Sequence, residues 1–246
     1  MKKLLPYILL VLLAAACDSE DAWDILKTKG DSKTETRSLT AFTGVTIYNG
    51  INVVLEKANR YEAVLDSWTN LLPKITLSVD SDGMLTIKDE NKFDFMRNPN
   101  NMTTIRLYYD GEINTITSHN NGIVTTADTL RTSHLTILSE DASGNIELVI
   151  KTSSIAIGTN NRNVGDIKLD GVSTHLDITN WGNAPINASK LDATYCSVTH
   201  RGSNDLYLNV ASTLEANIHS IGNIYYKGNP TVSTNHYGKG NIYAIP

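Results

Sequence analysis

Three histidines recur at a spacing that would let stacked coils of the chain bring them together around a metal ion. His200, His219 and His236 lie 19 and 17 residues apart, and imidazole is a common metal ligand. Their registers differ, because His219 lies five residues before Ile224 whereas His236 lies six before Ile242. The chain has no His-Glu-x-x-His motif, so we favour a surface column of polar strand residues and predict no metal site.

Charged residues in the middle of the chain could serve polysaccharide chemistry. Asp166, Asp170 and Asp177 lie near Arg162 and Lys168 in the sequence. Polysaccharide lyases with a β-helix fold combine aspartate-bound calcium with a basic residue. The same residue types are common in any polar solenoid, so we predict no catalytic residues and keep a polysaccharide-active enzyme as an alternative.

Other motifs for chemistry are incomplete. Asp80-Ser81-Asp82-Gly83 starts like a calcium loop, but Met84 and Asn91 stand where further ligands are needed. A hairpin turn is the better interpretation. The chain has no Gly-x-Ser-x-Gly or Walker A motif, and Gly238-Lys239-Gly240 lacks the third glycine of a dinucleotide site. We therefore predict no cofactor.

Aromatic residues give the best indication of binding. Tyr225, Tyr226, Tyr237 and Tyr243 cluster near the C-terminus, and Trp181 lies earlier. Such side chains bind sugars and protein surfaces because they combine apolar area with a polar tip. Strand side chains alternate, so one ring of Tyr225-Tyr226 should point inward and one outward. We favour the interpretation that the cluster covers the open end of a stack, and ligand binding is the alternative.

The N-terminus predicts export and a lipid anchor. Lys2 and Lys3 precede an apolar run and three alanines, which is the layout of a signal peptide. The run is shorter than the ~20 residues of a membrane-spanning helix. Cys17 follows the alanines and so resembles the lipobox of bacterial lipoproteins, whose cysteine is acylated after cleavage just before it. This resemblance implies a signal peptide at 1–16 and membrane attachment through Cys17; an ordinary secreted protein is the alternative.

Residues 17–38 read as a flexible acidic tether behind the lipid. The segment 18–24 resembles the export signal of Bacteroidota surface lipoproteins, which would place the protein on the outer membrane at the cell surface. A plain spacer, and a periplasm-facing anchor, are the alternatives. Asp128-Thr129-Leu130 resembles the O-glycosylation acceptor motif of the same lineage.

Charge and cysteine content exclude some classes of function. Without residues 1–16, 19 basic residues stand against 26 acidic ones, a net charge of −7, so we predict no nucleic-acid partner. Once Cys17 is acylated, Cys196 is the last free cysteine and no intrachain disulfide can form. We expect Cys196 to be a small buried apolar residue.

Short strands dominate the folded part. Apolar residues mostly alternate on either side of Asn49-Gly50, and 61–65 and 103–109 read as strands. Residues 75–79 and 84–88 flank the Asp80–Gly83 turn and predict a hairpin. No window carries a helical stripe. We expect an N-terminal β region over 39–112.

A repeated Gly-x-Ile pattern marks the rest, over 113–246. It recurs with Ile146, Ile167, Ile224 and Ile242, and more loosely with Leu206, at intervals of 21, 39, 18 and 18 residues. A drifting period near 20 residues with Gly/Asn turns predicts a β-solenoid, in which each coil covers the apolar face of the next. A meandering antiparallel sandwich is the alternative.

These residues together resemble the bacterial family called "putative auto-transporter adhesin, head GIN domain". The name-bearing triplet stands here as Gly50-Ile51-Asn52, preceded by Phe42-Thr43-Gly44-Val45. Leu71–Ile75, Asp82–Ile87 and the Gly-Asn-Ile repeats also fit, so the resemblance covers 39–246. It implies an all-β fold, a right-handed β-helix-like solenoid preceded by an N-terminal β region, and supplies no established activity.

We therefore expect a lipid-anchored envelope module without catalytic activity. Its partners would be the membrane, through the lipid, and a glycan or protein ligand on a strand face. The alternatives are an enzyme acting on a polysaccharide, or a periplasmic scaffold that partners another envelope component.

Overall fold

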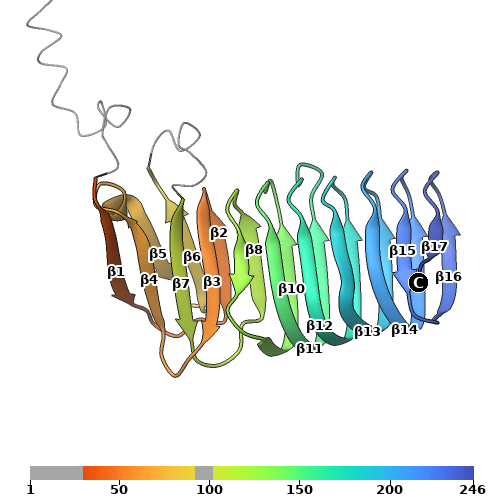
Figure 1. The fold of residues 1–246 in the computed structure, drawn as a ribbon, viewed down its shortest axis with the longest axis horizontal. Helices are drawn as coiled ribbons and strands as arrows, with labels where there is room; N and C mark the ends of the chain where they lie inside the picture. The colour runs from red at the N-terminus through yellow and green to blue at the C-terminus, as the bar shows by residue number, and fades with distance from the viewer. Residues whose placement is uncertain (1–29, 92–101) are drawn as a thin grey trace, which may run out of the picture.

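The computed structural model describes residues 30–91 and 102–246, so the predicted signal peptide, Cys17 and the start of the tether lie outside the described residues. Within these two ranges no helix is both long and apolar enough to cross a membrane. Figure 1 shows the fold, an elongated β-solenoid. Its elements are β1 (Ser32–Ser38), β2 (Gly44–Tyr48), β3 (Ile51–Lys57), β4 (Glu62–Trp68), the 3₁₀ turn η2 (Leu72–Lys74), β5 (Ile75–Val79), β6 (Met84–Asp89), β7 (Thr103–Tyr109), β8 (Thr115–His119), β9 (Val124–Thr126), β10 (Leu130–Ser139), β11 (Ile146–Thr159), β12 (Ile167–Asn180), β13 (Ile186–His200), β14 (Leu206–Ile218), β15 (Ile224–Lys227), β16 (Thr231–His236) and β17 (Ile242–Ala244).

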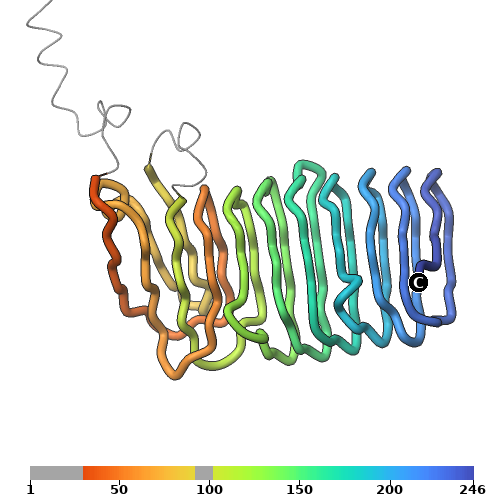
Figure 2. The backbone as a smooth tube through the Cα atoms, viewed as in Figure 1, coloured from red at the N-terminus to blue at the C-terminus, as the bar shows by residue number. Residues whose placement is uncertain are grey.

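Each coil of the solenoid has two sides and two corners. At the glycine corner, which includes turns 140–145, 181–185 and 219–223, the chain passes from one side to the other through a Gly/Asn turn. At the opposite corner the long strands β11 to β14 bend without a break and pair with both neighbouring coils. The tube trace in Figure 2 shows the coils stacked side by side along the long axis. The predicted solenoid is confirmed.

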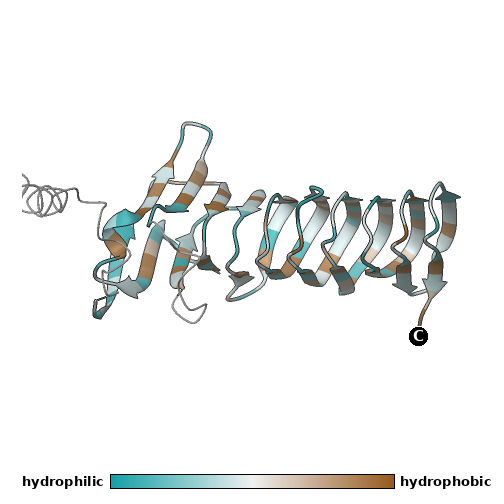
Figure 3. Ribbon diagram, turned by 90° about the horizontal axis from the view of Figure 1, so that it is seen from above, coloured by the Kyte–Doolittle hydropathy of each residue, from teal (hydrophilic) through white to brown (hydrophobic). Residues whose placement is uncertain are grey.

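Two outer faces follow from this geometry. Face A is the outward side of β2, β8, β16 and the second halves of β10 to β14. Face B is the outward side of β3, β9, β15, β17 and the first halves of β11 to β14. Apolar and polar residues alternate along the strands (Figure 3), so each strand sends one set of side chains into the core and the other onto a face.

The repeated isoleucines form one buried column inside the stack. Val53, Val124, Ile146, Ile167, Ile186, Leu206 and Ile224 are consecutive register partners and at most 1% exposed. Ile186 explains the interval of 39 residues, since it is the rung between Ile167 and Leu206. The pattern missed it because Ala184-Pro185 separates it from Gly182-Asn183. Parallel stacking of identical positions is what makes the repeat visible in the sequence.

The strands of 39–112 continue the same stack. β2 and β3 pair in parallel with β8 and β9, and β6 and β7 form a further parallel layer outside them. β4, β1 and β5 then run antiparallel at this end. The predicted hairpin is confirmed as β5–β6. The N-terminal strands therefore begin the solenoid's two sheets.

The tether prediction is wrong for 32–38, which form β1. Its side chains are polar and mostly exposed, so no apolar alternation marked it as a strand. Pairing with β4 holds it in place. Thr34 donates to the Asp66 carboxylate at 2.6 Å, and the Arg37 guanidinium donates to the carbonyls of Leu72 and Ile75.

Candidate functional site: two unlike faces of the solenoid

The three periodic histidines do not come together. His200 is completely buried and pairs in register with Ile218, which in turn pairs with His236. His219 lies one residue further along and stacks on Tyr237, with ring centroids 4.5 Å apart. The surface-column prediction is therefore wrong for His200. In the two described ranges no group of three or more His, Cys, Asp or Glu side chains could hold a metal ion.

The aspartate and basic cluster is also dispersed. Asp170 lies on face B and Asp177 on face A, because β12 turns the opposite corner between them. Arg162 pairs with Asp141 at 3.6 Å. In the β5–β6 turn the Asp80 carboxylate accepts the backbone N–H groups of Asp82 and Met84 at 3.0 and 2.9 Å. These contacts explain the Asp80 carboxylate as a turn-stabilising group.

Cys196 lies inside the stack and is 4% exposed. Burial is the main cause that raises the pKa of its thiol far above the ordinary value, with the charge of Asp177 adding to it. Since the thiolate is the nucleophilic form, this is an inert core residue, which confirms its predicted role.

Face A is a flat surface of small polar groups. From β8 to β16 its outward positions carry neither lysine nor arginine. Threonine, serine and asparagine occupy most of them, and two carboxylates, Asp177 and Glu215, lie in one column separated by Ser197. His175 stacks on Tyr195 with centroids 5.1 Å apart beside a shallow pocket of about 340 Å³.

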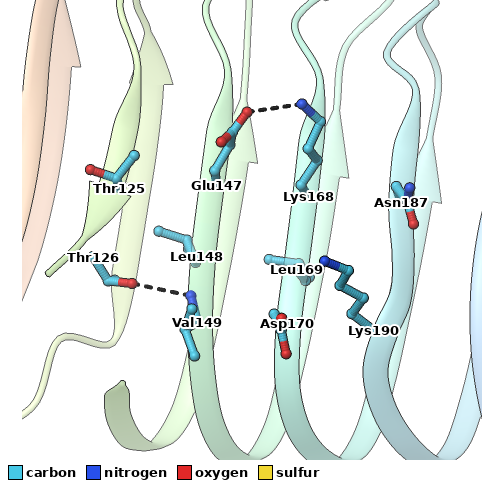
Figure 4. A pocket seen from close by; sticks show the side chains of 10 residues that line it. All are labelled: Thr125, Thr126, Glu147, Leu148, Val149, Lys168, Leu169, Asp170, Asn187 and Lys190. Carbon is cyan, nitrogen blue, oxygen red and sulfur yellow. Dashed lines mark hydrogen bonds and ion pairs between the residues drawn. The ribbon is translucent and has the colours of Figure 1, made fainter. Parts of the chain in front are cut away.

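Face B carries a charged groove of about 420 Å³ (Figure 4). Leu148 and Leu169, each 2% exposed, contribute the apolar part of its lining. Lys168 donates to Glu147 at 2.9 Å and lies 3.8 Å from Asp166. The hydrogen bond to Glu147, followed by that residue's charge, raises the pKa of Lys168. The remaining lining residues are Thr125, Thr126, Val149, Asp170, Asn187 and Lys190.

The groove leads into a ladder of tyrosines. Lys168, Asn187 and Tyr207 are successive register partners on face B. Tyr207, Tyr225 and Tyr243 follow in the same column, with ring centroids 5.1 and 5.3 Å apart and the planes 13° and 24° from parallel. Face B thus presents one continuous column that changes from charged to aromatic.

The expected alternation at Tyr225-Tyr226 is confirmed, because Tyr226 packs against the core while Tyr225 stacks outside. The predicted covering role holds for Tyr226 but not for Tyr237 and Tyr243, which are 68% and 45% exposed. Tyr207 was missed because it stands apart from the C-terminal cluster. Its signal was the spacing of 18 residues to Tyr225, which equals the local coil period.

A family model named "putative auto-transporter adhesin, head GIN domain" matches residues 41–230. The chain belongs to this family. No curated protein matches the chain. Among solved structures, a "putative adhesin" from Bacteroides fragilis is 22% identical, with a TM-score of 0.79 over 87% of this chain and 97% of that one. A "putative lipid binding protein" from Parabacteroides distasonis is 18% identical, with a TM-score of 0.67 over 88% and 98% of the two chains. The family name and these relatives point to an adhesion-type module of the cell surface or envelope.

The triplet that names the head GIN domain is a structural lock. Asn120, 1% exposed, accepts the backbone N–H of Ile51 at 3.0 Å and donates to its carbonyl at 2.7 Å. The Asn52 side chain accepts the backbone N–H of Ile123 at 3.0 Å. Asn145 and Asn223 repeat this contact to the next coil. These asparagines satisfy turn backbone groups that would otherwise be unpaired, so the motif builds the corner.

Proposed function

We propose that this head GIN domain is a lipid-anchored, non-catalytic binding module of the outer membrane that faces the outside of the cell. The lipobox-like sequence ending at Cys17 and the acidic segment behind it support the anchor and its location. The family's adhesion-type character supports binding as the task.

Face B is the proposed binding face. The single observation that carries this is the unbroken column Thr125, Glu147, Lys168, Asn187, Tyr207, Tyr225 and Tyr243. Tyrosine and lysine are exposed here beside an apolar groove floor, which is the combination that binding surfaces use. The Glu147 carboxylate is engaged by Lys168, which suits recognition better than proton transfer.

The stacking of the tyrosines limits the ligand. Tyr225 has a ring on both sides, so a sugar ring cannot lie flat on it. The ladder instead offers ring edges and a row of hydroxyl groups at the spacing of the strands, about 4.8 Å. An extended glycan or peptide lying along the solenoid axis matches this row of hydrogen-bonding groups.

Protease shaving of intact cells tests the anchor and the location. The wild-type chain should be cleaved on whole cells, and Cys17→Ala should be released in soluble form. Protection of the wild type until the outer membrane is broken would contradict the surface location and favour a periplasmic scaffold. Retention of Cys17→Ala in the membrane would contradict the anchor.

A further inference from the structure

The glycine corner carries an exposed strip of apolar and basic side chains. In successive coils the residues before its glycines are Val164, Trp181, Arg201, Ile221 and Lys239. Val164, Trp181 and Ile221 are 54%, 52% and 62% exposed, and Arg201 and Lys239 are also exposed. We call these five residues the corner ridge.

The ridge is contiguous because the glycines behind it touch. A methyl group on Gly202 would overlap the carbonyl oxygen of Gly182, and one on Gly240 would overlap that of Gly222. The Gly222 N–H donates to the Gly202 carbonyl at 3.3 Å. Successive ridge residues are therefore about one strand spacing, roughly 4.8 Å, apart.

Apolar and basic groups also interact along the ridge. The Arg201 guanidinium lies over the Trp181 ring, 4.6 Å from its centroid. Trp181 and Ile221 flank Arg201 in the stack, and Lys239 follows. Large apolar side chains gathered on an exposed strip mark an interaction surface. Tryptophan with arginine and lysine is the composition that seats a surface at the boundary between lipid headgroups and acyl chains.

The N-terminal end of the described chain lies at the same edge. β1 is antiparallel to β4, and β4 is antiparallel to β7, which is parallel to β3. β1 therefore starts where β3 starts, at the glycine corner, as Figure 1 shows. Cys17 precedes Gly30 by 13 residues, a reach of at most about 45 Å. Seven strand spacings, about 34 Å, separate β1 from β13, beside Trp181.

We propose that the corner ridge rests on the lipid bilayer that holds the Cys17 anchor. Val164, Trp181 and Ile221 enter the headgroup region, and Arg201 and Lys239 contact lipid phosphates. This rests on the anchor of the proposed function. Two weak contacts, a lipid and a surface patch, give stable attachment where one is marginal. Faces A and B then stand upright from the membrane, with the opposite corner outermost.

The acylated chain in vesicles of phosphatidylethanolamine and phosphatidylglycerol tests this orientation. An environment-sensitive dye is attached to Ile221→Cys or, as the matched control, to Val172→Cys, whose valine is 49% exposed near the opposite corner. Buried Cys196 stays unlabelled. We expect the emission to shift to the blue with the dye at 221 and not at 172.

The outcomes separate the two proposals. Flotation with the vesicles and a blue shift at 221 alone supports the ridge. Flotation with equal emission at both positions overturns the ridge and leaves the anchor standing. If the chain does not float with the vesicles, the anchor fails and the ridge proposal falls with it. Trp181→Ser should reduce the shift at 221 at least twofold if the ridge inserts as a unit.

Discussion

The two corners of the solenoid handle chain length differently. Leu176 to Ile186, Cys196 to Leu206, Leu214 to Ile224 and Val232 to Ile242 are core positions joined through the glycine corner, and each path is ten residues. Across the opposite corner, Ile167 to Leu176, Ile186 to Cys196 and Leu206 to Leu214 take nine, ten and eight residues. The register irregularities of the β12–β13 and β13–β14 pairs lie on this second path.

One corner therefore fixes the stack and the other absorbs variation. The glycine corner has no room for an added atom, because its backbones touch from coil to coil. The opposite corner is a bend in continuous strands, and a bulge there costs little since the ladder resumes beyond it. The fixed corner is what keeps columns such as Tyr207–Tyr225–Tyr243 aligned on face B.

One-residue insertions test this difference most severely. An alanine inserted after Asn183, in the glycine corner, should prevent folding, because every later coil would lose its register. An alanine inserted after Asp192, at the opposite corner, should fold and lose about 1–2 kcal/mol. Circular dichroism with urea unfolding measures both, and equal stability of the two insertions would remove the distinction.

Glycine substitution should have the next largest effect. Ala at Gly165 would overlap the Gly144 carbonyl oxygen, so Gly165→Ala should cost about 3–5 kcal/mol in unfolding free energy. Gly158→Ala is the matched control, since the nearest atom is the end of the flexible Leu138 side chain, at 3.0 Å. A similar loss at both positions would show that corner packing is not the cause.

The asparagine lock comes third. Asn120→Ala removes two hydrogen bonds to Ile51 and leaves buried backbone groups unpaired, which should cost about 2–4 kcal/mol. Asn121→Ala changes its exposed neighbour and should stay within about 0.5 kcal/mol. Thermal unfolding compares the two variants, and a neutral Asn120→Ala would show that the lock is dispensable.

A histidine beside the glycine corner gives the smallest effect, a pH dependence. Burial lowers the pKa of His200 below its ordinary value, so the folded chain holds it neutral while the unfolded chain takes up a proton below about pH 6.5. Its contribution to stability is present above that pH and is lost as pH falls. His200→Asn should flatten the melting temperature between pH 7.5 and 5.5, and an unchanged pH profile would contradict this.

The sequence predicts the elements better than their placement. Glycine turns and the Ile column follow from local patterns, because identical positions stack in parallel. The side of the coil on which a residue lies depends on how many residues the opposite corner uses, and that number varies. Asp170 and Asp177 therefore looked like neighbours and lie on different faces. β1 was missed because hydrogen bonding to β4, and not apolar burial, makes it a strand.

Ligand binding through face B is the central functional claim, and tyrosine substitution tests it directly. Cells that display the wild-type chain, Tyr225→Ala or Tyr195→Ala would be applied to a glycan array and to immobilised mucin and fibronectin. Tyr195 is the matched control, since it is 44% exposed on face A. We predict wild-type binding to at least one surface, a loss of at least tenfold for Tyr225→Ala, and no change for Tyr195→Ala. Equal losses for both variants, or no binding by the wild type, would contradict the account.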